Sequence, residues 1–401
     1  MYYYGRSVVG QGMFGRDRMD SLERQYASGD REYTIRQYRE GDREELLAVY
    51  QEVLDSTLSD DWFAWKYETN PYTEDIPVYV AEFDGELVGA VGFWVLELHT
   101  GSRQIPAVQS CDGAVRPEHR REGLFTELFR IGLDRFAADG FEIVFDFPNQ
   151  LSKATFEKYG WQLVERQETY FRVQQPDAMV DGESVGPLSA LIRGGARVLS
   201  RGYLAAKSRQ RPSVADHPKI DVDRSATIPS RTLAALYRHD IPDKLHLVRD
   251  ETFYEWRFGN PHWEYTTYVG RYDGSPVAAV TTGTKVDGGA TITHLTDIVP
   301  LVSSRPRTAV LVSVLEAILE ANEDAALVVA PSGVIPDDVL SAYGFRSDRT
   351  VPLSLVSTPT IHGVYALMDD DEADGDRWVL DGKRVTDPEA WRTTFSEYDT
   401  G

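Results

Sequence analysis

The sequence carries one pattern twice, which restricts the chain to a fold built from two similar halves. Three pairs of segments match in the same order: residues 62–71 with 253–261, 79–85 with 268–274, and 158–161 with 342–345. In the first pair Trp65 corresponds to Trp256, and in the second pair both segments end in Asp-Gly. An Asp-Gly after an apolar run predicts a strand that enters a tight hairpin turn. Because the matches keep their order while their offset falls only slowly, we expect two tandem copies of one domain.

A strand–turn–helix pattern follows in the first copy. Residues 115–125 read Val-Arg-Pro-Glu-His-Arg-Arg-Glu-Gly-Leu-Phe, and a helix is predicted from Leu124 to Phe136. The first N–H groups of such a helix have no partner within the helix, and the positive end of the helix dipole lies behind them. Gly123 allows a ligand to approach the backbone closely, while Arg120 and Arg121 add positive charge. The pattern therefore predicts a binding site for a pyrophosphate.

The sequence after this helix extends the pattern. Gly140 ends the helix, residues 141–147 predict a short buried strand, and a second helix is predicted from about Ser152. With the Val-x-Pro-x-x-Arg-x-x-Gly turn before it and Tyr-Gly-Trp at 159–161 after it, this run resembles the GNAT (Gcn5-related N-acetyltransferase) superfamily over residues 33–172. The resemblance implies an α/β (α+β) fold of two tandem GNAT-like domains. Each would be a mixed, mostly antiparallel sheet with flanking helices and with splayed fourth and fifth strands.

The resemblance also implies a cosubstrate, acetyl-CoA or another acyl-CoA. Its pyrophosphate would bind the turn, and its pantetheine would lie between the splayed strands. The residues carried over as cofactor-binding are Ala114, Val115, Arg120, Arg121, Glu122, Gly123, Leu124, Phe125, Thr126 and Asn149. Two positions depart from the family pattern. Phe125 replaces a small residue of the turn, and Phe156 replaces the Tyr that often protonates the departing thiolate.

The implied activity is direct transfer of an acyl group from acyl-CoA to a primary amine on a small molecule, a sugar or a peptide. A general base would assist such an amine, and Asp112 and Asp146 are the carboxylates on the two splayed strands. The alternative for each Asp is a turn or capping role at the end of its strand. Tyr159 is the hydroxyl nearest in sequence to the acid position lost at Phe156. Because that acid is replaced, a non-catalytic CoA-binding or scaffolding protein is the alternative function.

The second copy lacks the binding turn. Pro306 falls at the position of Arg121, and Thr308 falls at the position of Gly123. Proline has no N–H to offer a phosphate, and Thr308 adds bulk where glycine allowed close approach. We therefore expect a degenerate second copy that has lost acyl-CoA binding. Tandem copies of this kind, one active and one degenerate, resemble the enhanced-intracellular-survival acetyltransferases.

These patterns predict five segments. They are an N-terminal extension (1–32), a catalytic-type GNAT domain (33–172), a basic helical linker (173–222), a degenerate GNAT-like domain (223–368), and an acidic loop with a C-terminal tail (369–401). Within the linker, Ser184 to Ala215 contains six basic residues and no acidic residue, and Arg193, Arg197 and Arg201 recur along one helical face. These cations either pair with acidic neighbours or bind an anionic ligand or surface. The aromatic-rich tail is expected to pack on the second copy.

The composition limits the partners and the location. The net charge of −22, from 64 acidic and 42 basic residues, argues against nucleic acid as a partner. Only eight of the basic residues are Lys, which is typical of a halophilic protein, with an ordinary acidic protein as the alternative. Cys111 is the single cysteine and the His residues show no metal-ligand spacing, so we expect neither a disulfide nor a metal. No apolar run suits a membrane span or a signal core, so a cytoplasmic protein without membrane contact is predicted.

Overall fold

The computed structural model describes residues 23–54, 58–148, 153–175, 219–302, 305–351, 353–355, 357, 360–368 and 376–399. The basic segment from Ser184 to Ala215 and the acidic run at 369–375 lie outside these residues. The chain divides into two compact units, the first formed by 1–57, 77–92 and 112–132 and the second by 58–76, 93–111 and 133–401. Strands β4 (Glu86–His99) and β5 (Gln104–Val115) and helix α3 (Leu124–Ala138) each run from one unit into the other.

The first unit is an antiparallel arrangement of strands with helix α1 (Arg43–Leu54). Its strands lie in the order β1 (Arg24–Ser28), β2 (Arg31–Gln37), β3 (Val78–Phe83) and the first part of β4. Residues 24–32, which the sequence assigned to an N-terminal extension, therefore belong to this unit's sheet. Phe83 pairs with Glu86 across Asp84 and Gly85, whose φ angles are 52° and 85°. These angles confirm the predicted Asp-Gly hairpin turn.

The second unit contains two sets of strands. The first set runs in the order β5, β6 (Ile143–Asp146), β16 (Ile361–Ala366) and β7 (Gln162–Arg166). The second set is a sheet with the order β15 (Arg346–Ser347), β8 (Thr169–Val173), β14 (Leu327–Pro331), β13 (Ala290–Val299), β12 (Ser275–Asp287), β11 (Glu264–Tyr272) and β9 (Ile220–Ser225). Only β5–β6 and β13–β14 are parallel among these described pairs. The mixed, mostly antiparallel α/β architecture predicted from the sequence is thus confirmed.

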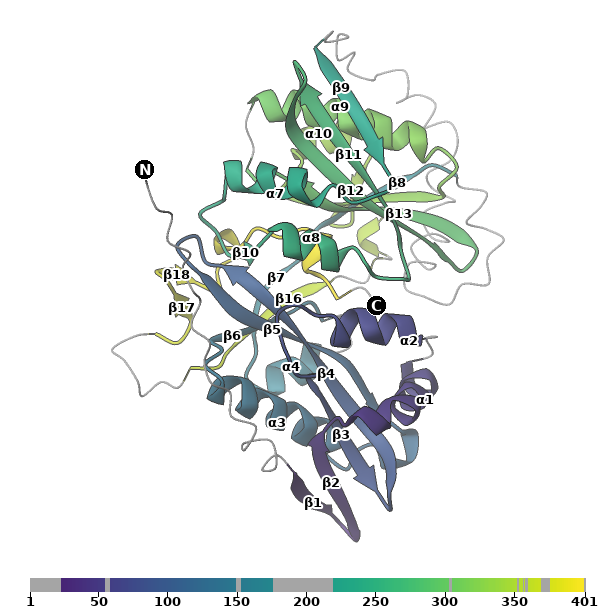
Figure 1. The fold of residues 1–401 in the computed structure, drawn as a ribbon, viewed down its shortest axis with the longest axis vertical. Coiled ribbons are helices and arrows are strands. Elements are labelled where there is room, and N and C mark those ends of the chain that lie inside the picture. Colours follow the sequence, from purple (N-terminus) through teal and green to yellow (C-terminus); the bar gives the residue numbers. More distant parts are fainter. Residues whose placement is uncertain are drawn as a thin grey trace, which may run out of the picture. The chain divides into compact units, whose positions relative to one another are not determined.

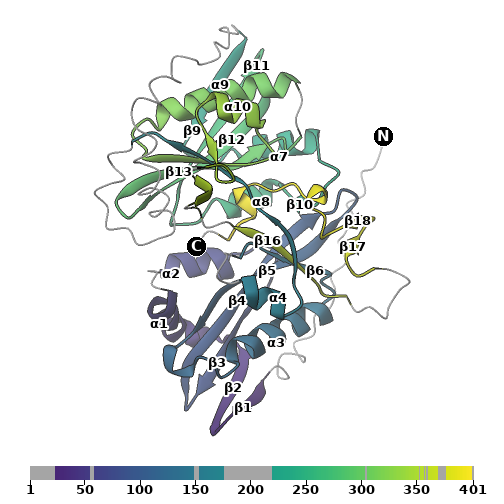
Figure 2. The ribbon, with the colours of Figure 1, turned by 180° about the vertical axis from the view of Figure 1, so that it is seen from behind.

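Helices cover the second sheet. Helix α9 (Arg305–Ala321) lies across β9, β11 and β12, as Figures 1 and 2 show from opposite sides. Its Val314 and Ile318 are fully buried in a core that includes Leu295 of β13 and Val328 of β14. Apolar burial of this kind stabilises the fold by about 25 cal/mol per Å². The remaining described helices of this unit are α2 (Asp60–Phe63), α4 (Lys153–Lys158), α7 (Ser230–His239), α8 (Glu251–Arg257) and α10 (Asp337–Ala342).

The two copies exchange their last strands. Strand β8 follows β7 in the chain but pairs with β14 and β15, with Phe171 opposite Val329. Strand β16 follows β15 in the chain but pairs with β6 and β7, with Gly363 opposite Asp146. Each set of strands therefore receives one central strand from the other copy. Neither predicted domain, 33–172 or 223–368, contains all the strands that its own sheet needs.

The repeated Trp motifs meet inside the second unit. The Trp65 indole N–H donates to the Trp256 carbonyl at 2.8 Å, and the Trp256 indole N–H donates to the Trp65 carbonyl at 2.8 Å. Their rings stack with centroids 6.1 Å apart. Equivalent residues of the repeated sequence motif thus contact each other reciprocally.

The C-terminal tail crosses the second unit. Its short hairpin of β17 (Val379–Leu380) and β18 (Lys383–Arg384) is followed by Trp391, which forms a parallel bridge with Leu245 just before β10 (His246–Leu247). Phe395 then packs in the same apolar cluster as Ile292 of β13 and Leu327 of β14, as expected for a tail that packs on the second copy. The Trp391 ring also lies 5.7 Å from the Phe145 ring of β6, so the tail contacts strands of both copies.

Candidate active site

The turn between β5 and α3 belongs to the first unit. A short 3-10 turn at Pro117–His119 follows β5, and α3 begins at Leu124, which is the helix start that the sequence predicted. Arg121 and Gly123 have positive φ angles of 68° and 81°. Arg120 before them is extended, with φ −72° and ψ 155°. The first amide groups of α3 have no acceptors within the helix, and the positive end of the helix dipole lies behind them.

The side chains of the turn differ in exposure. Those of Arg120 and Arg121 are exposed, and the Arg120 Nε donates to the Val115 carbonyl at 3.0 Å. Those of Ala114 and Leu124 are buried, so these two residues could contact a ligand only through backbone atoms. Asn149 lies outside the described residues.

Phe125 fills space beside strand β5. A side-chain carbon placed on Gly113 would lie 2.6 Å from the Phe125 ring, so the ring rests directly on the glycine backbone. The ring also stacks with Phe129, with centroids 6.1 Å apart and planes inclined by 7°. The aromatic residue that replaces a small one in the family pattern is therefore accommodated by a glycine on the neighbouring strand.

Gly123 is needed for a second reason besides its φ angle. A side-chain carbon at this position would lie 2.5 Å from the hydroxyl oxygen of Tyr26, which is on β1. The sequence explained Gly123 by the close approach of a ligand. In the structure the group that approaches its α-carbon is a tyrosine of the same unit.

The two candidate bases lie in different units. Asp112 is in the first unit, half-buried, and its φ angle of 49° marks an irregularity near the end of β5. Asp146 is in the second unit at the end of β6, and its side chain is buried. The Ser110 hydroxyl donates to its Oδ2, and the Phe147 N–H donates to its Oδ1 at 2.8 Å.

The environment of Asp146 shifts the pKa of its carboxyl. Burial raises the pKa of its carboxyl from 3.8 to about 7, because a charged carboxylate loses hydration there. The hydrogen bonds from Ser110 and Phe147 lower this pKa, and the nearby Asp399 carboxylate raises it. A carboxyl group with a pKa close to neutral can accept a proton and return it under physiological conditions.

The C-terminal tail brings further polar groups to the same part of the second unit. The fully buried Lys66 ammonium donates to both carboxylate oxygens of Asp399 at 2.9 Å. The Gln109 side-chain amide donates to the Glu397 carbonyl at 2.6 Å. The Cys111 thiol is buried and lies 3.4 Å from the Tyr67 hydroxyl.

Sequence reasoning missed Lys66, Ser110 and Asp399. The only available signal was the aromatic tail, which predicted packing but did not indicate where the tail ends.

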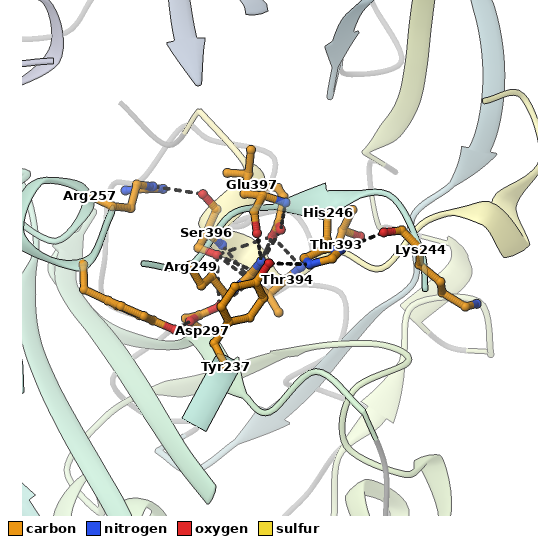
Figure 3. A network of polar contacts seen from close by, with 12 residues as sticks. Tyr237, Lys244, His246, Arg249, Arg257, Asp297, Thr393, Thr394, Ser396 and Glu397 are labelled. Carbon is orange, nitrogen blue, oxygen red and sulfur yellow. Dashed lines mark hydrogen bonds and ion pairs between the residues drawn. The ribbon is translucent and has the colours of Figure 1, made fainter. Parts of the chain in front are cut away.

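A buried ionic network holds the tail in place (Figure 3). The Arg249 guanidinium, which is completely buried, donates to Glu397 at 2.8 Å and to Asp297 at 3.0 Å. The Thr394 and Ser396 hydroxyls also contact the Asp297 carboxylate at 3.1 Å each. A buried charge is tolerated only when it is paired and hydrogen-bonded, and each charge here is. The turn at residues 395–397 is consequently fixed to β13.

The acid candidates lie on and after α4. The Phe156 ring packs edge-on against Trp161, with centroids 4.7 Å apart, and carries no proton donor. Tyr159 is half-buried, and the Lys158 ammonium lies 5.5 Å from its ring centre. The contacts described for Tyr159 and for Asp146 involve different residues.

Part of the first copy is similar in sequence to a known protein family. Residues 34–164 match the family model described as an acetyltransferase (GNAT) domain. This match covers about a third of the chain, and over these residues the first copy is similar to a GNAT domain. No curated protein matches the sequence significantly.

Solved structures share the fold over 84% of this chain. One is a GCN5-related N-acetyltransferase from Anabaena variabilis, with a TM-score of 0.53, 11% identity and 73% of its own length covered. Another is a probable N-acyltransferase from Enterococcus faecalis, with a TM-score of 0.56, 10% identity and 72% of its length covered. At such identities the likeness extends to the fold alone. Within the described part of the chain, no helix combines the length and apolar character that a membrane span requires.

Proposed function

We propose that the protein is an N-acyltransferase that moves an acetyl or other acyl group from acyl-CoA to a primary amine. The observation that carries this proposal is the turn at 117–123. It combines two positive φ angles, two exposed Arg side chains and the start of α3 inside a segment whose sequence matches a GNAT domain. Such a turn is suited to the pyrophosphate of CoA. The proposed activity is that of an acetyltransferase domain. The proposal does not specify which amine accepts the acyl group.

The strand geometry supports a place for the pantetheine arm. The described register pair between β5 and β6 joins Val108 and Val144, and β6 pairs through its other edge with β16, where Asp146 lies opposite Gly363. In this proposal the backbone of β5 beyond Val108, where no further pair with β6 is described, pairs with the amide groups of pantetheine. Holding a thioester beside an amine in this way can supply several kcal/mol of the rate enhancement through proximity.

Asp146 is the proposed proton acceptor. Direct transfer needs the acceptor amine in its neutral form, and it releases one proton as the amide bond forms and the C–S bond of the thioester breaks. A carboxyl with a pKa of about 7 is ionised in a large fraction of molecules at neutral pH and can take that proton, directly or through water. The CoA thiolate leaves with a pKa near that of Cys, roughly 8.5, so Phe156 does not prevent its departure.

Calorimetry with CoA tests the binding part. The double variant Arg120→Glu/Arg121→Glu should weaken CoA binding at least tenfold, because it replaces two exposed cations of the turn by anions. The matched control is Arg231→Glu/Arg238→Glu on the exposed face of α7 in the second copy, which should leave binding unchanged. Equal losses in both variants would contradict the assignment.

An amine panel tests the chemistry. CoA release from acetyl-CoA is measured against small amines, aminosugars and peptides. Turnover with one class would establish the transferase and identify its acceptor. Saturable acetyl-CoA binding without turnover on any amine would favour the alternative, a non-catalytic CoA-binding protein, which the Phe at position 156 would then explain.

A further inference from the structure

The hairpin of β1 and β2 contacts the turn at 117–123 through several groups. The Tyr26 hydroxyl donates to the Glu122 carbonyl at 2.7 Å, and the Ser28 hydroxyl donates to the Glu122 carboxylate at 2.7 Å. The Arg31 guanidinium donates to the Glu118 carbonyl at 2.8 Å and lies 3.8 Å from the Glu122 carboxylate. All of these residues belong to the first unit.

The hydrogen bond from Tyr26 fixes the direction of one particular amide. The Glu122 carbonyl and the Gly123 N–H belong to the same peptide unit, and in a trans peptide they point in opposite directions. With the carbonyl held toward Tyr26, the Gly123 N–H must point to the other side of the turn. Gly123, at φ 81°, could otherwise rotate this peptide freely.

The same hairpin restrains the acidic side chain of the turn. Glu122 is the only carboxylate between the two Arg residues and the helix start, and it would repel a pyrophosphate if its side chain faced the ligand. Its contacts with Ser28 and Arg31 hold the carboxylate toward the hairpin, where part of its charge is compensated. The ring of Tyr33 on β2 completes the contact, since its hydroxyl lies 3.1 Å from Nδ1 of the buried His119.

We propose that the β1–β2 hairpin holds the pyrophosphate turn in its anion-binding conformation, with Tyr26 as the positioning residue. The hairpin acts on the carbonyl side of the turn, so the N–H side is left to the ligand. This role rests on the proposed function, because it concerns the same acyl-CoA site. Tyr26 would affect the phosphate-bearing part of the cosubstrate and not the thioester.

The test compares two ligands in the full-length protein. CoA contains the pyrophosphate, whereas pantetheine lacks it. Removing the hydroxyl with Tyr26→Phe should weaken CoA binding about tenfold, the upper range for one hydrogen bond, and should leave pantetheine binding unchanged. The control is Tyr272→Phe, which removes a hydroxyl from an exposed Tyr of the second copy and should change neither.

The outcomes separate this inference from the proposed function. If the wild type binds CoA and Tyr26→Phe binds it equally well, the positioning role is wrong and the proposed function stands. If Tyr26→Phe weakens the binding of CoA and of pantetheine by the same factor, Tyr26 has only a structural role. The same conclusion follows if its loss of CoA affinity is accompanied by a lower melting temperature. If the wild type binds no CoA at all, the proposed function itself fails.

Discussion

At the scale of single residues, Asp146 connects stability with activity. The folded protein raises the pKa of its carboxyl from 3.8 to about 7, so the fold prefers the protonated acid. The stability that the folded protein gains from the protonated Asp146 is fully present below about pH 4 and is lost as the pH rises toward 7. A difference of roughly three pKa units corresponds to about 4 kcal/mol of stability at most.

The variant Asp146→Asn should therefore be more stable than the wild type at pH 8 but less active. Asparagine keeps the shape and cannot ionise, so the loss of stability between pH 4 and pH 7 should be smaller in this variant. Acyl transfer should fall by about 10² to 10⁴ because a general base is removed. Thermal melts across pH and CoA-release rates would measure both effects, with Asp139→Asn in the exposed turn after α3 as the control. An unchanged rate would exclude Asp146 as the base.

At the scale of elements, the C-terminal turn at residues 395–397 depends on one arginine. Arg249 compensates two buried carboxylates, Asp297 and Glu397, which are about 1% exposed. Removing one partner of a buried ion pair leaves an uncompensated charge, which costs more than the pair itself contributes.

Arg249→Met should destabilise the protein by about 3–5 kcal/mol, measured by urea unfolding. The matched control is Arg271→Met, whose partner Asp223 is exposed, and it should cost about 1 kcal/mol or less. Asp297→Asn/Glu397→Gln introduced together with Arg249→Met should recover part of the loss. If the wild type, Arg249→Met and the triple variant all unfold at the same urea concentration, the network contributes nothing to stability.

The exchanged strands give a second prediction at this scale. Strands β8 and β16 each complete the strand set of the other copy, so the copies should remain together without a covalent link. A protease site inserted between Gln175 and Lys219 would cut the chain between the copies. We expect the two fragments to elute together in size-exclusion chromatography and to separate only in denaturant. Separation under native conditions would show that strand exchange does not hold the copies together.

At the scale of the whole molecule, the sequence predicted what is local and repeated. The helix predicted to begin at Leu124 begins there in α3, and the Asp-Gly turns occur in both copies, because backbone geometry at these positions is set by neighbouring residues. The strand exchange could not be predicted, since strands of two similar copies have the same pattern and fit either sheet. The contacts of Tyr26 and of Asp399 were also missed, because they depend on tertiary contacts over 96 and 333 residues of sequence.

The net charge allows a last prediction for the whole molecule. With 64 acidic and 42 basic residues, carboxylates repel one another across the surface at low ionic strength. The Debye length falls from about 10 Å at 0.1 M salt to about 3 Å at 1 M, so added KCl should raise the melting temperature until this repulsion is screened. Thermal melts from 0.05 to about 3 M KCl would show whether the rise levels off near 1 M, as screening alone requires, or continues, as in a protein adapted to high salt. A melting temperature that does not rise at all would contradict the interpretation of the acidic composition as a halophilic feature.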